Sequence, residues 1–211
     1  MVTTVVFDVG ETLLDETALW ETVAEWIGVP SFTLAAAVGI LIERGEDHEH
    51  VFDLVGPTTP RDGRYTYEAR REHFYPDAIP CLRELRSRGL RVGVAGNSSR
   101  QIEQALRALD LPVDFLTSGA SLGAQKPDPV FFAALAQSVG CDPAEMCYVG
   151  DRIDNDVLPA LAAGMRAALV RRGPWALVQA ARSWTAEPTI VVDRLDELPA
   201  AIAALASASG S

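Results

Sequence analysis

Cysteine is scarce in this sequence, and long apolar segments are absent. The three cysteines, Cys81, Cys141 and Cys147, cannot all pair and do not have the spacing of a metal site. No apolar run reaches the roughly 20 residues of a membrane-spanning helix, and the first residues lack a basic region followed by an apolar signal core. We therefore expect reduced thiols in a cytoplasmic protein that contacts no membrane.

Positive charge is also in short supply. The chain has 18 lysine and arginine residues against 29 aspartate and glutamate residues, which gives a formal net charge of −11. This charge repels nucleic-acid backbones and anionic membrane surfaces, so we expect neither as a partner. A metal cation would be attracted instead.

The sequence is rich in apolar residues, which make up 48% of its 211 positions. Such a chain can bury a large core, but it is long for one compact domain and short for two. We therefore expect a core domain with an insertion, in a protein that is a monomer or a homodimer.

The core domain is predicted over residues 1–15 and 77–207. The run TVVF before Asp8 is typical of a buried parallel strand. From residue 77 onward, helical and strand patterns alternate, which predicts an α/β fold: a doubly wound, Rossmann-like parallel sheet with helices on both faces. Further strands are expected over residues 90–96, 114–119, 146–151, 166–170 and 189–192.

The insertion, residues 16–76, contains helical patterns and no obvious strand. It predicts a helical cap domain. The expected helices cover about residues 16–27, 31–45, 50–56 and 68–74, with a polar loop before the last one. Residues 208–211 are expected to be a disordered tail.

Polar residues follow several of the predicted strands. Asp8 follows the first strand, Asn97 and Ser98 follow the second, and Asp151 follows the fourth. The carboxyl ends of parallel strands meet at one crevice, so these side chains should lie close together. Facing carboxylates repel one another unless a cation lies between them, and Mg²⁺ prefers such oxygen ligands. Lys126 can balance the charge of a carboxylate nucleophile and of an incoming phosphate.

The order of these residues resembles the haloacid dehalogenase-like superfamily of hydrolases. The resemblance consists of Asp8 with Thr12, Asn97 after the second strand, Lys126 in KPDPVFF, and the run GDRIDND that begins at Gly150. It covers nearly the whole chain, because this family places a cap directly after the first motif.

The resemblance implies a Mg²⁺-dependent phosphatase that acts on a small phosphorylated molecule. Asp8 would be the nucleophile that forms an aspartyl-phosphate, and Lys126 would hold Asp8 and the phosphate. The implied metal ligands are Asp8, the main-chain carbonyl of Gly10, Asp151 and, through a water, Asp156. In addition, Thr12 would tie the turn after the first strand, and Asn155 would orient Lys126 or its loop.

Gly10 departs from the pattern of the phosphatases in this family. They usually have an aspartate there, two residues after the nucleophile, which serves as general acid and base. General acid catalysis is typically worth about 10² to 10⁴ in rate. Glu11 is the candidate replacement, provided that a turn at Gly10 brings its side chain to the same side as Asp8. From the sequence alone, Gly10→Asp is expected to speed the hydrolysis of alkyl phosphates.

Gly96 is the second departure, because the family usually has a serine or threonine there to bind phosphate. Main-chain N–H groups around Asn97, Ser98 and Ser99, at the start of the next helix, can do part of that work. The predicted substrate-binding residues are therefore Gly96, Asn97, Ser98 and Lys126.

Two alternative functions stay open. Without the acid and the hydroxyl, the protein could keep the fold and the metal site but turn over poorly, as a binding or regulatory protein. A metal-independent 2-haloacid dehalogenase is the other alternative, although the carboxylates of GDRIDND favour a metal-dependent enzyme. The substrate is not indicated, because nothing in the cap is recognisable.

Overall fold

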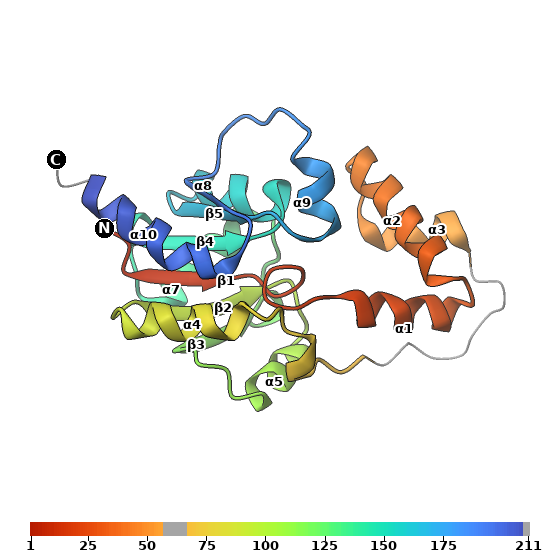
Figure 1. Ribbon diagram of the computed structural model, residues 1–211, viewed down its shortest axis with the longest axis horizontal. Coiled ribbons are helices and arrows are strands. Elements are labelled where there is room, and N and C mark those ends of the chain that lie inside the picture. The colour runs from red at the N-terminus through yellow and green to blue at the C-terminus, as the bar shows by residue number, and fades with distance from the viewer. Residues whose placement is uncertain (57–66, 209–211) are drawn as a thin grey trace.

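A six-stranded parallel sheet forms the centre of the molecule (Figure 1). The computed structural model describes residues 1–56 and 67–208. Within these residues the strand order is β3-β2-β1-β4-β5-β6, and all neighbouring strands are parallel. The strands are β1 (Thr4–Phe7), β2 (Arg91–Gly96), β3 (Phe115–Ser118), β4 (Met146–Gly150), β5 (Arg166–Val170) and β6 (Ile190–Val192).

Helices cover both faces of this sheet, because alternate side chains of a strand point to opposite sides. Val5 and Phe7 belong to the apolar cluster that also includes α4 (Ala78–Ser87) and α10 (Leu198–Ala208). Val6 belongs to the opposite cluster. That second cluster is formed with α7 (Pro129–Val139) and α8 (Leu158–Ala162). The predicted doubly wound α/β fold is confirmed.

The remaining regular elements are shorter or lie at the sheet margin. They are α5 (Arg100–Ala108), α6 (Gly119–Leu122), α9 (Gly173–Gln179), the 3₁₀ turns Pro143–Glu145 and Leu195–Glu197, and one π-helical turn, Ile153–Val157. Helix α9 was not expected from the sequence.

The segment between β1 and α4 is helical in its described part. It contains α1 (Thr17–Ile27), α2 (Ser31–Arg44), a 3₁₀ turn (His48–His50) and α3 (Val51–Val55). The predicted fourth helix is wrong, since only a 3₁₀ turn, Arg71–His73, forms there. Residues 57–66, which hold most of the predicted polar loop, and residues 209–211 of the predicted tail lie outside the described residues.

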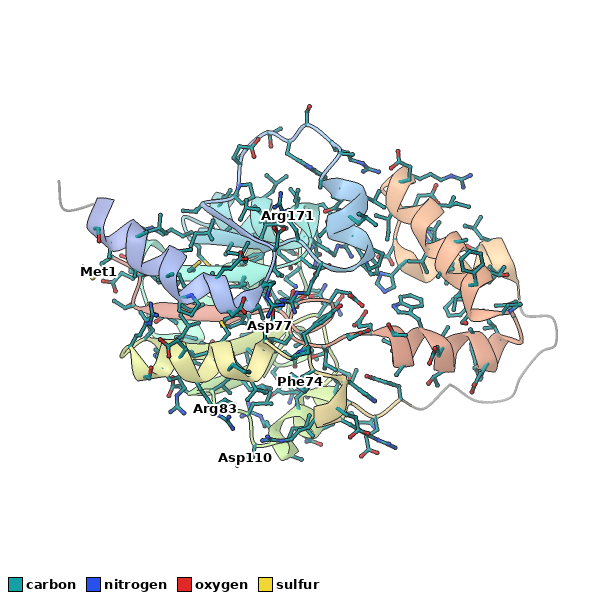
Figure 2. All side chains as sticks on the ribbon, in the orientation of Figure 1. Met1, Phe74, Asp77, Arg83, Asp110 and Arg171 are labelled. Carbon is teal, nitrogen blue, oxygen red and sulfur yellow. The ribbon has the colours of Figure 1, made fainter. Side chains whose placement is uncertain are left out.

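The helices of this segment have an apolar cluster of their own, and it extends to α9. Val23, Ile27, Leu34 and Leu41 are buried in it together with Trp175 of α9. Figure 1 shows α2 beside α9 and away from the sheet. The chain returns to the core near Phe74 and Asp77, which are labelled in Figure 2.

No single helix in the described residues is long and apolar enough to cross a membrane. Only α1 and α2 taken together, bent by 108° at their junction, pass a test of length and composition.

Candidate active site

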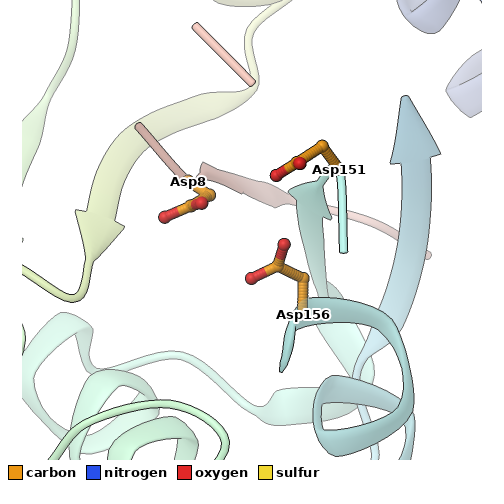
Figure 3. Close-up of side chains that lie close together, drawn as sticks. All are labelled: Asp8, Asp151 and Asp156. Carbon is orange, nitrogen blue, oxygen red and sulfur yellow. The ribbon is translucent and has the colours of Figure 1, made fainter. Parts of the chain in front are cut away.

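Three carboxylates meet at the carboxyl ends of the central strands. Asp8 follows β1, and its main-chain N–H donates to the Val149 carbonyl of β4 at 2.9 Å. Oxygens of Asp8, Asp151 and Asp156 lie within 4.8 Å of one another, and Figure 3 shows the three side chains close together at the ends of the strands. The predicted convergence at the strand ends is therefore present.

The turn after β4 brings Asp156 back to Asp151. The main-chain N–H of Arg152 donates to Oδ2 of Asp156 at 3.0 Å, within the turn that leads into the π-helical residues Ile153–Val157. Gly150 makes room for this approach, since a β-carbon there would lie 2.2 Å from Oδ2 of Asp156. The glycine of GDRIDND is thus required by packing.

Lys126 reaches the carboxylates from the loop before α7. Its Nζ lies 2.8 Å from Oδ1 of Asp8 and 2.5 Å from Oδ1 of Asp156. The same Nζ lies over the Tyr148 ring, 5.3 Å from the ring centroid. The Tyr148 hydroxyl donates to the Ala95 carbonyl at 2.6 Å. Lys126 is the only lysine in the chain. Its compact ammonium contacts both carboxylates at once.

Burial and mutual charge shift the pKa values of the residues in this cluster. Desolvation raises the pKa of Asp156 to about 6, outweighing the attraction of Lys126. Burial, and then the charges of Asp156 and Asp8, raise the pKa of Asp151 well above its usual value. Burial opposes the charge of Lys126, but the two carboxylates outweigh it and raise the pKa of the lysine. The cluster carries more negative charge than one lysine can neutralise.

This donor set fits a hard divalent cation. Oδ2 of Asp151 is buried and has no hydrogen-bond partner among the described residues, while its Oδ1 accepts a 3.4 Å contact from the Thr12 hydroxyl. A buried, unpaired carboxylate oxygen is costly unless a cation or water binds it. Carboxylate oxygens at this spacing are the ligands that Mg²⁺ takes.

The predicted substrate-binding residues Gly96, Asn97 and Ser98 lie at the carboxyl end of β2, and they differ in their contacts. Both polar atoms of the Asn97 side chain form hydrogen bonds with the Lys126 main chain. Nδ2 of Asn97 donates to the carbonyl at 2.8 Å, and Oδ1 accepts from the N–H at 2.7 Å. The Ser98 hydroxyl is buried without a partner among the described residues. The Ser98 N–H donates to the Gly96 carbonyl. Ser98 therefore has a free hydroxyl, whereas Asn97 positions Lys126.

Glu11 is held by the framework of the site. Its Oε2 accepts from the Tyr75 hydroxyl at 2.6 Å, and its Oε1 accepts from the Glu16 N–H at 3.0 Å. Its backbone has φ 51°, the left-handed region that an L-residue rarely adopts. A β-carbon on Gly173 would lie 2.6 Å from Oε2 of Glu11, so Gly173 accommodates this side chain.

Glu16 is the residue that sequence reasoning missed. A β-carbon on Gly10 would lie 2.2 Å from its Oε1. Burial, and then the charges of Glu11 and Asp8, raise the pKa of Glu16 to about 8. Tyr148 was also missed, although a tyrosine within the apolar run MCYVG signals a buried hydroxyl that needs a partner.

The carboxylate-lysine cluster lies at the carboxyl edge of the sheet, as the resemblance to a family of hydrolases implied. A family model described as haloacid dehalogenase-like hydrolase matches residues 2–164. The chain therefore belongs to the haloacid dehalogenase-like hydrolases, as the resemblance implied.

Relatives and solved structures agree with this family. A phosphoglycolate phosphatase of Cereibacter sphaeroides is 33% identical over 195 residues, which cover 80% of this chain and 85% of that protein. A glyceraldehyde 3-phosphate phosphatase of Methanopyrus kandleri is 35% identical over 128 residues, or 59% of this chain; the match spans 54% of that relative's length. The structure of an L-2-haloacid dehalogenase from Xanthobacter autotrophicus covers 96% of this chain and 99% of its own, with a TM-score of 0.72 and 23% identity. At 23% identity, this structural similarity shows that the two proteins share a fold.

Proposed function

We propose that this protein is a Mg²⁺-dependent phosphatase that hydrolyses a small phosphorylated molecule through an aspartyl-phosphate on Asp8. The observation that carries the proposal is the contact of Lys126 with Asp8 inside a cluster of three carboxylates. The relatives named as phosphatases support the same reaction class.

Each residue of the cluster has a role in this reaction. Asp8 attacks the phosphorus, so that one difficult displacement becomes two easier ones. Lys126 holds the Asp8 carboxylate in place through its 2.8 Å contact and offers positive charge to the phosphoryl oxygens. The Ser98 hydroxyl, which is buried without a partner among the described residues, would donate to the phosphate. Asn97 fixes the main chain of Lys126.

Asp8, Asp151, Asp156 and the Gly10 carbonyl would hold the cation. Bound there, Mg²⁺ would neutralise negative charge on the phosphoryl group.

We also propose that the helices between β1 and α4 act as a cap domain over residues 16–76 and choose the substrate. These helices have their own apolar cluster. The two connections of the segment to the core lie side by side, since the Asp15 N–H donates to the His73 carbonyl at 2.8 Å. Two such crossing points would let it move as a unit. The core would then be residues 1–15 and 77–207. The cytoplasmic location and the monomer or homodimer stay predictions of the sequence.

A panel of phosphorylated metabolites, assayed with Mg²⁺ and with excess chelator, tests the function. We expect phosphate release that needs Mg²⁺ and that falls by at least about 10³ in Asp8→Asn, since the nucleophile is lost. A parallel assay of chloride release from 2-chloropropionate tests the dehalogenase alternative. Chloride release without phosphate release would contradict the proposal, and metal binding without either would favour a binding protein.

A further inference from the structure

The side chain missing at Gly10 has left a space that another residue fills. A β-carbon on Gly10 would lie 2.2 Å from Oε1, 2.7 Å from the carboxyl carbon and 3.3 Å from Oε2 of Glu16. All three atoms belong to one carboxyl group. A carboxyl group therefore stands beside Gly10 at the place where a side chain on that residue would begin.

Several contacts hold Glu16 in this position. Its main-chain N–H donates to Oε1 of Glu11, and its carbonyl accepts from the main-chain N–H of Trp20 at 3.0 Å. The Trp20 side chain also hydrogen-bonds the Glu16 carboxylate. Glu16 directly precedes α1. A functional group held by this many partners is oriented before any substrate binds.

Glu11 is less suited to move a proton, because both of its oxygens already accept hydrogen bonds. Tyr75 and the Glu16 main chain are the donors, and both belong to the framework. Freeing either oxygen would leave a partly buried donor without its partner, and this opposes such a change.

We propose that the Glu16 carboxyl group takes the place of the acid absent at Gly10 and transfers the proton during hydrolysis. This role rests on the proposed phosphatase function. In the first step an Asp8 oxygen bonds to phosphorus, the bond from phosphorus to the ester oxygen breaks, and the departing oxygen takes the Glu16 proton. In the second step a water oxygen bonds to phosphorus, the Asp8–phosphorus bond breaks, and Glu16 takes a proton from that water.

The first test is Glu16→Gln, which keeps the shape and removes the transferable proton. With Mg²⁺, we expect turnover of an alkyl phosphate such as glycerol phosphate to fall by about 10² to 10⁴. Turnover of p-nitrophenyl phosphate should fall much less, because its leaving group needs little protonation. Glu187→Gln, at an exposed glutamate outside the inserted helices, is the control and should change neither rate.

The second test measures thermal stability as well as activity. Gly10→Asp alone should lower the melting temperature, because the new side chain meets the Glu16 carboxylate at once. Gly10→Asp combined with Glu16→Ala should regain both the melting temperature and the alkyl phosphate activity. The gain expected from Gly10→Asp on the sequence alone should thus appear only when Glu16 is removed.

The outcomes separate this role from the function on which it rests. A parent protein that hydrolyses neither ester with Mg²⁺ overturns the phosphatase and the Glu16 role together. A parent that hydrolyses both, with Glu16→Gln equally active or equally impaired on the two, overturns the Glu16 role alone. A Gly10→Asp variant with the same melting temperature as the parent would also overturn the Glu16 role.

Discussion

Oδ1 of Asp8 lies 2.6 Å from the position that a β-carbon on Gly96 would take. The carboxylate proposed as nucleophile is thus in contact with the backbone of the neighbouring strand, and only a glycine there permits it. The hydroxyl residue that the family usually has at this position could not be added without moving Asp8.

We predict that Gly96→Ala impairs catalysis more than folding. The methyl group should push Asp8 away from Lys126, and a misplacement of this size should lower kcat/KM for phosphate esters by about 10². Gly39→Ala is the matched control, because a β-carbon at Gly39 meets nothing within 4 Å. In helix α2 it should leave kcat/KM unchanged and raise stability by roughly 0.5 to 1 kcal/mol. Full activity of Gly96→Ala would refute the steric argument.

The second prediction concerns Mg²⁺ binding, measured by isothermal titration calorimetry. Asp151→Asn should weaken binding at least tenfold, since the buried, unpaired Oδ2 of Asp151 is the oxygen most in need of a cation. Asp154→Asn should bind as the parent does, because the Asp154 carboxylate pairs with Arg152 at 2.9 Å and lies outside the three-carboxylate cluster. Equal affinities for the parent and Asp151→Asn would place the cation elsewhere.

The third prediction concerns the return from the helical segment to the core. Arg172 binds Asp77 with both guanidinium nitrogens, at 3.0 and 2.6 Å, and stacks 4.3 Å from the Tyr75 ring. Arg172→Met would leave the buried Asp77 carboxylate without its charged partner, and such a loss typically lowers the free energy of unfolding by about 3 to 5 kcal/mol. Urea denaturation measures it.

The neighbouring arginine provides the control for that variant. Arg171 pairs with Asp193 on the surface, where both side chains are at least half exposed. Arg171→Met should therefore leave the free energy of unfolding close to that of the parent, because solvent screens an exposed ion pair. If the two variants lost similar amounts of unfolding free energy, burial of the ion pair would not determine the cost of breaking it.

The fourth prediction is a pH dependence of stability from Glu103. Burial opposes its ionisation, but hydrogen bonds from Ser118, Ser121 and Arg107 outweigh burial and lower its pKa below 4.5. A carboxyl group with a lowered folded-state pKa stabilises the fold fully above its unfolded pKa, and this contribution disappears as pH falls through the folded pKa.

Glu103→Gln should therefore be less stable than the parent at pH 7, by about 1 to 3 kcal/mol. The difference should shrink as the pH falls below about 4.5. Urea denaturation of both proteins between pH 3 and pH 7 measures it. A difference that grows toward acid would contradict the sign of the argument.

Local sequence was sufficient for most of the core. Strand β5 has the predicted limits, because RAALV is a short apolar run between a glycine turn and charged residues. Asp8 and Asp151 were also predictable, since parallel strands carry the residues at their carboxyl ends to one edge. Asp156 followed from the resemblance of GDRIDND to the family motif.

The predicted helix over residues 68–74 failed because it has no apolar face to bury. Charged residues dominate EARREHF. Arg71 donates instead to the carbonyls of Leu109 and Asp110, which directly follow α5. Helix α9 was missed for the opposite reason. Its seven residues are too few for a clear periodicity, and Trp175 is buried only because the inserted helices cover it.

The sequence by itself determined the fold class, the family and the carboxylates at the strand ends, because these follow from periodicity and from motifs of adjacent residues. Tertiary structure alone decided which carboxyl group stands beside Gly10. That choice depends on the turn after β1, where Glu11 is drawn to Tyr75 and Glu16 is folded back over the glycine. Neither contact is encoded in spacing, since each requires chain segments to be packed before the side chains can meet.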